Sequence, residues 1–420
     1  MSSFKPKSPD FRQDLLGRVA LALAPQFDLD RRTTAVRLAV MPWSDGDPAS
    51  AAQDMRELLE IVQGVWGGSG LPVSLEVRHP AWLDALLDGP GQSGVITEVP
   101  AFLLADEAVA RRVQAHHARG GQIALQGRPQ TESLPADLLP CLSWSVIGLE
   151  DDRRTGEWLQ PARAGDGASM RSLPTVQAQV GLESDVEAAF RRGVLAVTGW
   201  PFGDDIQYLD DSRVQNSARV VMDLIGRMDR GEDPPQLEAA LRSDAPLAFR
   251  LLRFLNSPAF GLRSTVESLQ QAIQLLGYHR LRRWLSLMLA SCGNEPAARV
   301  ALFAAMRRGL FMENLALSAG QDEAASELFM AGQFSLLDRV LHQPLASLLA
   351  LLPLRAAVRD MLLSGSGPLS SFRDLALAVE QPARSAIVSA ADALMLSPQQ
   401  LNAAFLHAQR EATRLNVMPD

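Results

Sequence analysis

The sequence is poor in cysteine and in long apolar runs. Its 420 residues include two cysteines, Cys141 and Cys292, one in each half of the chain. Neither has a nearby partner, so we expect neither a disulfide framework nor a cysteine zinc site, and a reduced compartment is the simplest interpretation. No apolar run approaches the roughly 20 residues that a membrane-spanning helix needs. Residues 1–18 lack the apolar core and cleavage pattern of a signal peptide. These absences predict a soluble cytoplasmic protein without a membrane partner.

Positive charge and histidine are also scarce. The formal net charge is −8, which argues against broad electrostatic attraction to nucleic acid, so we expect no nucleic-acid partner. The chain has six histidines and none of them is followed by aspartate. Hydrophobic residues make up 47% of the chain, enough for real cores, and the length favours two or more domains.

The N-terminal half alternates short apolar runs with amphipathic segments. Candidate helices cover residues 50–66, 104–118 and 184–192, and candidate strands cover 35–40, 72–77, 94–99, 122–125, 144–147, 173–180 and 194–197. Strands that alternate with helices indicate a mostly parallel sheet, either open or closed. With only about seven strands found, closure into a (β/α) barrel remains open at this point.

After residue 213 every periodic segment is helical, which indicates an all-α region packed helix on helix. Its centre is the stretch 244–289. Asp244 is suited to cap a helix, and the Asn256-Ser-Pro258 sequence ends that helix because proline disfavours the α conformation just before it. Gly277 is expected to break the next helix, and Tyr278 to begin a third. Further helices are expected over 214–228, 297–318, 323–341, 345–351, 355–363, 371–379, 383–394 and 398–414.

The central stretch carries a specific pattern: DAPL at 244–247, FLNSP at 254–258, GL at 261–262, QAI at 271–273 and LGYHRLRRW at 276–284. It resembles the HDOD domain, a helical signalling module related to HD-type phosphohydrolases. The resemblance places Asn256 and Gly277 at that family's signature positions. Where HD enzymes carry their metal-binding His-Asp doublet, this chain has Phe334-Ser335. Asp338 is expected to be a surface or capping group, so we expect no metal site here.

The N-terminal half carries weaker motifs at residues 24–30, 35–40, 95–98, 121–125 and 195–203. They resemble the EAL domain, a barrel that in its active form hydrolyses cyclic di-GMP with several carboxylates and divalent cations. In the aligned chain Arg37 replaces the motif glutamate, and Gln126-Gly127 replace the paired aspartates. The later lysine and glutamate positions fall near Ser145 and near 178–179. Only Glu98 keeps a carboxylate, so we expect no phosphodiesterase activity.

Two sets of residues are candidates for binding without catalysis. Arg37, Arg128 and Trp200 have the chemistry to pair a phosphate and stack a base; alternatively, the arginines are surface groups and Trp200 packs at the domain junction. The second set is basic and is suited to bind an acidic protein partner or a nucleotide. Alternatively, its arginines lie on solvated helix faces and pair with nearby acidic residues. The set comprises Arg280, Arg282, Arg283, Arg307 and Arg308.

The predicted fold class is α/β plus all-α: a degenerate EAL-like (β/α) barrel over residues 1–203 and an HDOD helical bundle over 204–420, with a hinge at 201–211. The predicted function is a non-enzymatic bacterial signalling protein that acts through unidentified protein partners, without catalytic residues, metal or cofactor. The alternative is a receptor for cyclic di-GMP or a related nucleotide, and homodimer formation is left open. The candidate ligand or partner contacts are Arg37, Glu98, Arg128, Trp200, Asn256, Arg280, Arg282 and Arg283.

Overall fold

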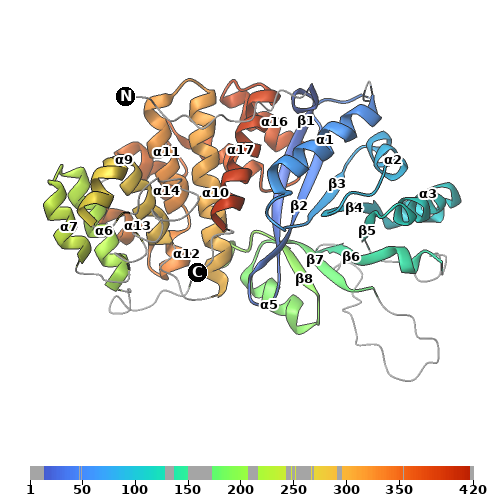
Figure 1. The fold of residues 1–420 in the computed structure, drawn as a ribbon, viewed down its shortest axis with the longest axis horizontal. Helices are drawn as coiled ribbons and strands as arrows, with labels where there is room; N and C mark the ends of the chain where they lie inside the picture. Colours follow the sequence, from blue (N-terminus) through green and yellow to red (C-terminus); the bar gives the residue numbers. More distant parts are fainter. Residues whose placement is uncertain are drawn as a thin grey trace. The chain divides into compact units, whose positions relative to one another are not determined.

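The chain forms two compact units, called here the barrel unit and the helical unit. The computed structural model describes residues 14–46, 48, 50–127, 137–149, 173–206, 216–242, 247, 251, 266, 269–290, 296–352 and 354–416. The barrel unit comprises Met1–Asp204, Asn314–Gln321 and Asp374–Asp420, and the helical unit comprises Asp205–Glu313 and Asp322–Arg373. Figure 1 shows the strands in the blue and green part of the chain and helices in the rest.

The barrel unit contains a closed barrel of eight strands in sequence order, from β1 to β8. Strand β1 pairs antiparallel with β2 and with β8, and each of the remaining neighbours pairs parallel. The strands are β1 Val19–Phe27, β2 Thr33–Pro42, β3 Val73–Val77, β4 Val95–Pro100, β5 Gln122–Gln126, β6 Leu142–Gly148, β7 Thr175–Val180 and β8 Ala196–Gly199. With the helical region described below, this barrel confirms the predicted fold class.

Helices follow most of the parallel strands and cover the barrel, because each presents one apolar stripe. The α-helices among them are α1 Ala51–Trp66, α2 Pro80–Asp88, α3 Glu107–Ala118 and α5 Glu183–Arg191. Short 3-10 helices lie at η1 Asp14–Gly17, η2 Ala101–Ala105 and η3 Leu139–Cys141. Three of the predicted helical segments match α1, α3 and α5, whereas α2 was not predicted.

The count of about seven strands was one short, because β1 was not recognised. Its sequence, VALALAPQF, is buried along almost its whole length, so it lacks the alternation of apolar and polar residues that marks a half-buried strand. Pro25 within it also argues against a central strand. The strand forms because its full length pairs with β2, from Val19 opposite Pro42 to Phe27 opposite Thr33.

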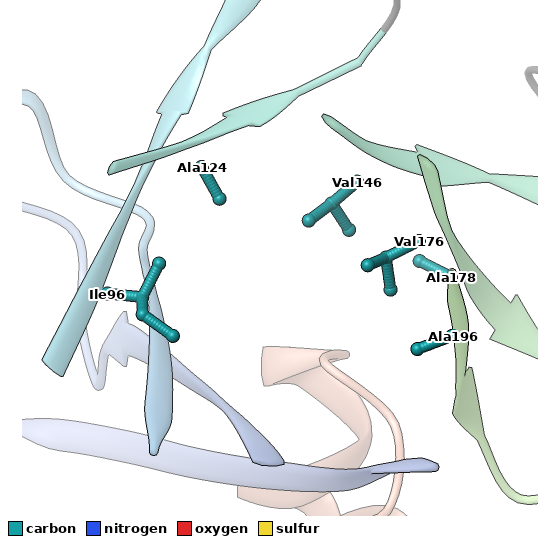
Figure 2. Close-up of a cluster of buried hydrophobic side chains, with 6 residues drawn as sticks. All are labelled: Ile96, Ala124, Val146, Val176, Ala178 and Ala196. Carbon is teal, nitrogen blue, oxygen red and sulfur yellow. The ribbon is translucent and has the colours of Figure 1, made fainter. Parts of the chain in front are cut away.

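Small and branched apolar side chains fill the lower part of the barrel interior. Figure 2 shows them pointing inward from β4 to β8, with two of them on β7; they are Ile96, Ala124, Val146, Val176, Ala178 and Ala196. Alternate residues of each strand face the interior of a barrel, so the residues two positions further along β4 and β5, Glu98 and Gln126, face the same interior. The apolar cluster therefore forms the floor beneath a polar layer.

Two C-terminal helices belong to the barrel unit: α16 Arg384–Ala393 and α17 Pro398–Asn416. Figure 1 shows both beside β1. The side-chain amide of Asn402, on α17, donates hydrogen bonds to the carbonyls of Leu16 at 2.8 Å and Val19 at 2.7 Å. The compact units thus differ from the predicted division at 203/204, because the C-terminal segment packs on the start of the barrel.

The helical unit consists of helices throughout its described residues, as predicted. They are α6 Asn216–Asp229, α7 Pro234–Arg242, α9 Leu269–Ala290, α10 Pro296–Ser318, α11 Asp322–Phe334, α12 Leu337–Leu341, α13 Leu345–Ala350, α14 Ala356–Ser364 and α15 Ser370–Ala378. The last residues of α10 and of α15 are assigned to the barrel unit. No helix among the described residues is long and apolar enough to cross a membrane.

Gly277 interrupts α9 with φ 66° and ψ 168°, so that two helices meet at a kink. Positive φ is readily adopted by glycine because it has no Cβ, and the break lies where the sequence predicted it. The predicted helix over 323–341 is divided, because Leu336 has non-helical dihedral angles between α11 and α12. Asn256 and the predicted helix end around it lie outside the described residues.

Candidate functional site

Charged side chains form a compact layer inside the barrel, toward the carboxyl ends of its parallel strands, the end at which barrel enzymes carry their active sites. Arg37 comes from β2, Glu76 from β3, Glu98 from β4 and Gln126 from the end of β5. Arg78 follows β3 directly, and its backbone N–H donates to the carbonyl of Val40 at 2.9 Å. We call these residues, together with Ser74 on β3, the ion-pair network.

Both oxygens of the Glu98 carboxylate are engaged by Arg37. Arg37 Nε donates to Glu98 Oε1 and Arg37 Nη2 donates to Glu98 Oε2, each at 2.7 Å. The hydroxyl of Ser74 donates a further hydrogen bond to Glu98 Oε1 at 2.8 Å. Glu98 is 2% exposed and Arg37 is 8% exposed, so this is a buried bidentate pair, the strongest kind of arginine–carboxylate contact.

Glu76 provides a second carboxylate on the other side of Arg37. Arg37 Nη2 lies 3.2 Å from Glu76 Oε2. Arg78 Nε donates to Glu76 Oε1 at 2.8 Å, and Gln126 Nε2 donates to the same oxygen at 3.1 Å. One guanidinium group therefore lies between two buried carboxylates, and a second guanidinium binds Glu76 Oε1, whereas Glu76 Oε2 accepts no hydrogen bond among the described residues.

The charges of the network cancel, since two arginines face two glutamates. Burial lowers the pKa of the Arg37 guanidinium, but the attraction and hydrogen bonds of Glu98, together with the attraction of Glu76, outweigh burial and raise that pKa overall. Arg37 therefore stays charged. A buried charge is tolerated when it is paired and hydrogen-bonded, and the pair of Arg37 with Glu98 meets both conditions.

This arrangement is poorly suited to binding a divalent cation. A cation would need carboxylate oxygens that are free to coordinate it, whereas the oxygens of Glu98 are already bonded to Arg37 and Ser74. It would also approach the positive charge of Arg37. Among the described residues, no group of three or more His, Cys, Asp or Glu side chains is placed to hold a metal ion.

A small cavity lies above the network, lined among others by Arg37, Glu76, Thr198, Trp200 and Glu380. Its volume is ≈ 30 Å³, room for about two water molecules and about a tenth of what a small-molecule site needs. Trp200 is 6% exposed, and its indole N–H donates to the carbonyl of Leu23 at 3.1 Å. Its ring is therefore not presented to a base in this structure.

The structure brings two of the predicted candidates, Arg37 and Glu98, into direct contact and gives Trp200 a buried position nearby. Arg128 lies outside the described residues. The sequence reasoning missed the other members of the network: Ser74, Glu76, Arg78 and Gln126. The available signal was the VSLEV sequence of β3, in which two polar residues alternate with apolar ones in a fully buried strand. Such alternation places both polar side chains on the interior face.

The candidate arginines of the helical unit are engaged with acids. Arg282 pairs with both oxygens of Asp229, at 2.8 and 2.9 Å. Arg283 Nη1 donates to both oxygens of Glu313, at 2.9 and 2.8 Å, and its guanidinium lies 4.2 Å from the centroid of the Phe329 ring. The side chain of Arg280 lies outside the described residues.

Of the remaining basic set, Arg307 is fully buried and Arg308 is 8% exposed. Arg308 Nη1 donates to the hydroxyl of Ser335 at 3.3 Å. These two arginines are part of the interior of the helical unit, whereas a patch that binds a partner electrostatically must be accessible to it.

Phe334 and Ser335, which the HDOD resemblance aligns with a metal-binding doublet, make other contacts in the structure. Phe334 is fully buried at the end of α11, and the Ser335 hydroxyl donates to the carbonyl of Gly332 at 2.7 Å. Asp338 accepts a hydrogen bond from the backbone N–H of Arg339 at 2.9 Å, and burial raises the pKa of its carboxyl. An apolar ring, a helix-bonded hydroxyl and a capping carboxylate do not form a coordination sphere.

Comparison with known proteins matches residues 217–342 to the HDOD domain model, which confirms that resemblance. Two curated relatives are an uncharacterized protein, YuxH, of Bacillus subtilis, 30% identical over 33% of this chain and 35% of that protein, and a protein of Vibrio cholerae named cyclic di-GMP phosphodiesterase CdgJ, 29% identical over 34% of this chain and 33% of that protein. The chain thus covers about a third of the length of each.

Among solved structures, a Klebsiella pneumoniae BlrP1 calcium/cy-diGMP complex aligns over 47% of this chain and 57% of that chain, with 15% sequence identity and a TM-score of 0.29. A BlrP1 manganese/cy-diGMP complex aligns similarly, over 46% and 61%, with 14% identity and a TM-score of 0.28. TM-scores this low support no conclusion about this chain. The HDOD match is established over residues 217–342, and the EAL-like character of the barrel stays a prediction.

Proposed function

We propose that this protein is a non-enzymatic signalling protein that acts through protein–protein contacts and does not hydrolyse cyclic di-GMP or other phosphoesters. The observation that carries the proposal is the position of Arg37. It occupies the interior of the barrel between two buried carboxylates, at 2.7 Å from Glu98 and 3.2 Å from Glu76. Its fixed charge replaces the cations that hydrolysis of this kind requires.

The helical unit supports the same proposal. The HDOD match covers residues 217–342, and within it Phe334 and Ser335 stand at the positions where hydrolytic relatives carry metal ligands. Without metal ligands at these positions, we propose that the domain acts through contacts with other proteins. Cross-linking of the full chain in extracts of its source organism, followed by mass spectrometry, tests this part. Failure to recover any reproducible partner would count against it.

The enzymatic part is tested by incubating the purified full chain with cyclic di-GMP and Mg²⁺ or Mn²⁺ and following product by chromatography. We expect no turnover above the blank. The matched control is the double variant Arg37→Met/Glu98→Leu, which removes the buried pair while filling similar volume. Turnover by the natural chain that the double variant lacks would overturn the proposal, whereas equal turnover in both would indicate a contaminating enzyme.

The alternative function is a receptor that binds cyclic di-GMP without cutting it. The name of CdgJ supports it, because that relative is described as acting on this nucleotide. The cavity of ≈ 30 Å³ and the buried Trp200 speak against it. Calorimetric titration with the nucleotide, with and without Mg²⁺, separates the two functions. Saturable heat that is absent in Arg37→Met/Glu98→Leu would favour the receptor.

A further inference from the structure

A cavity lies within the helical unit, between α6 and the segment around α13. Helix α6 packs on α7 and α9, whereas α13 packs on α12 and α14, and residues of both α6 and α13 line the cavity. Its volume is ≈ 570 Å³, within the range of about 300–1,000 Å³ that is typical of small-molecule sites. The cavity in the barrel unit, at ≈ 30 Å³, is far smaller. An organic molecule therefore fits in the helical unit and not in the barrel.

The lining of the cavity follows one face of α6. Arg219, Met222, Gly226 and Arg230 all line it, and their spacing of three, four and four residues places them on the same side of a helix. Arg219 and Arg230 are eleven residues apart, which is about 16 Å along the helix axis. The cavity is therefore elongated, and an elongated molecule has the shape that fits it.

The middle of the cavity is apolar. Met222 and Leu348 are almost fully buried, whereas Leu351 is 63% exposed, and all three line the cavity. Gly226 has no side chain, and a Cβ built there would meet only Arg230 Nη1 among the described residues, at 3.4 Å. The space beside α6 is thus open at this turn. Methionine and leucine side chains favour contact with an apolar body, whose binding would also remove the exposed Leu351 from water.

Arg230 provides a positive group that a neighbouring carboxylate holds in place. Its Nε and Nη2 donate to Glu232 Oε1 at 3.2 and 2.9 Å, and Arg227 Nη1 donates to Glu232 Oε2 at 3.3 Å. Among the described residues, no hydrogen bond of Arg230 uses Nη1, the nitrogen that lies closest to Gly226. The two N–H groups of this nitrogen can therefore donate to a bound molecule.

The charges around the cavity favour an anion. Asp223 is the one carboxylate among the described lining residues, and it accepts a hydrogen bond from Arg227 Nε at 2.7 Å. Arg227 and Arg230 thus balance the charges of Asp223 and Glu232, and Arg219 adds a positive charge to the lining. An anionic group at Arg230 gains a charge-assisted hydrogen bond, whereas a cation there would be repelled by the guanidinium group.

We propose that this cavity binds an amphipathic organic anion, with a carboxylate headgroup on Arg230 Nη1 and an elongated apolar body against Met222, Leu348 and Leu351. The arrangement sets an apolar surface beside a charged donor that the described residues leave available. The site stands whether or not the proposed function holds, because it lies wholly within the helical unit. Its test needs neither catalysis by the barrel nor a partner protein.

Calorimetric titration of the purified full chain with decanoate, below the concentration at which decanoate forms micelles, tests the site. We expect saturable binding of one decanoate per chain. Decylammonium has the same apolar chain with the opposite charge, and it should bind at least about tenfold more weakly. Butyrate has the same headgroup with a short chain, and it should also bind at least about tenfold more weakly, because it buries less apolar surface.

The variant Arg230→Gln tests the headgroup contact. We expect it to weaken decanoate binding about three- to tenfold, because a charged hydrogen bond at an exposed arginine contributes modestly. The side chain of Arg230 is 61% exposed. The matched control is Arg111→Gln, on α3 of the barrel unit, where the arginine is 69% exposed. This control should leave the affinity for decanoate within about twofold of the natural chain.

The variant Gly226→Leu tests the cavity itself, because its side chain fills the space beside α6. We expect it to weaken decanoate binding at least about tenfold, whereas Gly226→Ala, which adds one methyl group, should change the affinity by less than about threefold. Both residues form helix more readily than glycine, so α6 should stay intact in each variant.

Thiol protection keeps the site testable if a variant at Gly226 fails to fold. Ser347→Cys places a thiol on the lining of the cavity, and Ala346→Cys places one on the adjacent exposed residue, which does not line it. Saturating decanoate should slow alkylation of the first thiol at least about fivefold by occupying the cavity, and leave the second within about twofold. Peptide mass spectrometry measures both rates.

Three results would overturn the proposal. Absence of saturable decanoate binding to the natural chain would exclude the small-molecule site and leave the exposed Leu351 for contact with a protein. Binding that Gly226→Leu leaves unchanged, or a Ser347→Cys thiol that decanoate does not protect, would place the ligand outside the cavity. Equal affinity for decanoate and decylammonium would contradict the contact with Arg230.

Discussion

The barrel unit and the helical unit place arginine–carboxylate pairs in contrasting surroundings. In the barrel, the side chains of Arg37 and Glu98 are 9% and 0% exposed. In the helical unit, those of Arg282 and Asp229 are 27% and 20% exposed. Similar contacts therefore contribute differently to stability. Removing one partner of a buried pair leaves a charge without compensation, whereas a pair that water reaches can lose a partner at a small cost in stability.

The largest effect is expected for Arg37→Ala, which leaves Glu98 buried and bonded only to Ser74. We expect the free energy of unfolding to fall by about 3–5 kcal/mol, measured by urea denaturation with tryptophan fluorescence.

The double variant Arg37→Met/Glu98→Leu is the control for this prediction, because it removes both charges of the pair. Its stability should return to within about 2 kcal/mol of the natural chain. A double variant as unstable as Arg37→Ala would show that altered side-chain packing, and not the unpaired charge, causes the loss of stability.

A smaller effect is expected for Asn402→Ala, which leaves the carbonyls of Leu16 and Val19 without their partner from α17. Loss of a buried partner costs about 1–3 kcal/mol. Denaturation should show that loss, and hydrogen exchange should locate it in η1 and the start of β1. Unchanged exchange at these sites would mean that α17 is held by apolar contacts alone.

In the helical unit, Gly277→Ala is expected to destabilise by about 1–3 kcal/mol, because φ 66° with ψ 168° at the α9 kink is a region that essentially only glycine adopts. Gly226→Ala is the matched control. Gly226 lies inside α6, where an added Cβ meets only the end of the flexible Arg230 side chain, at 3.4 Å. Alanine there should be neutral or stabilise by up to about 1 kcal/mol. Equal effects at both positions would argue against the kink.

The smallest effect is expected for Arg282→Met, which removes the partner of Asp229 near the surface. Burial raises the pKa of the Asp229 carboxyl, and Arg282 opposes that shift. We expect a loss of about 1 kcal/mol or less at low salt, which shrinks further at high ionic strength. A loss as large as that of Arg37→Ala would remove the contrast between the units.

Features set by local sequence could be predicted from the sequence. The break at Gly277 follows from the conformational freedom of glycine, and most helices and strands follow from apolar periodicity. Strand β1 could not be found this way, since a strand buried on both faces has no alternation. The assignment of α16 and α17 to the barrel unit could not be predicted either, because it depends on packing between residues far apart in the chain.

In the candidate site, too, some features could be predicted from local sequence and others depend on packing between distant residues. Arg37 and Glu98 could be named from their places in aligned strands, but their mutual pairing depends on register. Glu76 was overlooked although VSLEV alternates polar with apolar residues, and the register that sets Arg37 opposite Ser74 shows that this polar face of β3 lies beside Arg37. The role of Trp200 depends on its bond to Leu23, 177 positions away in the sequence, a distance that no local pattern bridges.

We propose that guanidinium groups in the barrel stand where a hydrolytic barrel would hold cations. The most direct test of this proposal is a titration of the full chain with Mn²⁺, followed by electron paramagnetic resonance of the free ion, at neutral pH. We expect no stoichiometric binding of Mn²⁺ to the natural chain. One or more tightly bound Mn²⁺ ions per chain, lost in the Arg37→Met/Glu98→Leu variant, would contradict it.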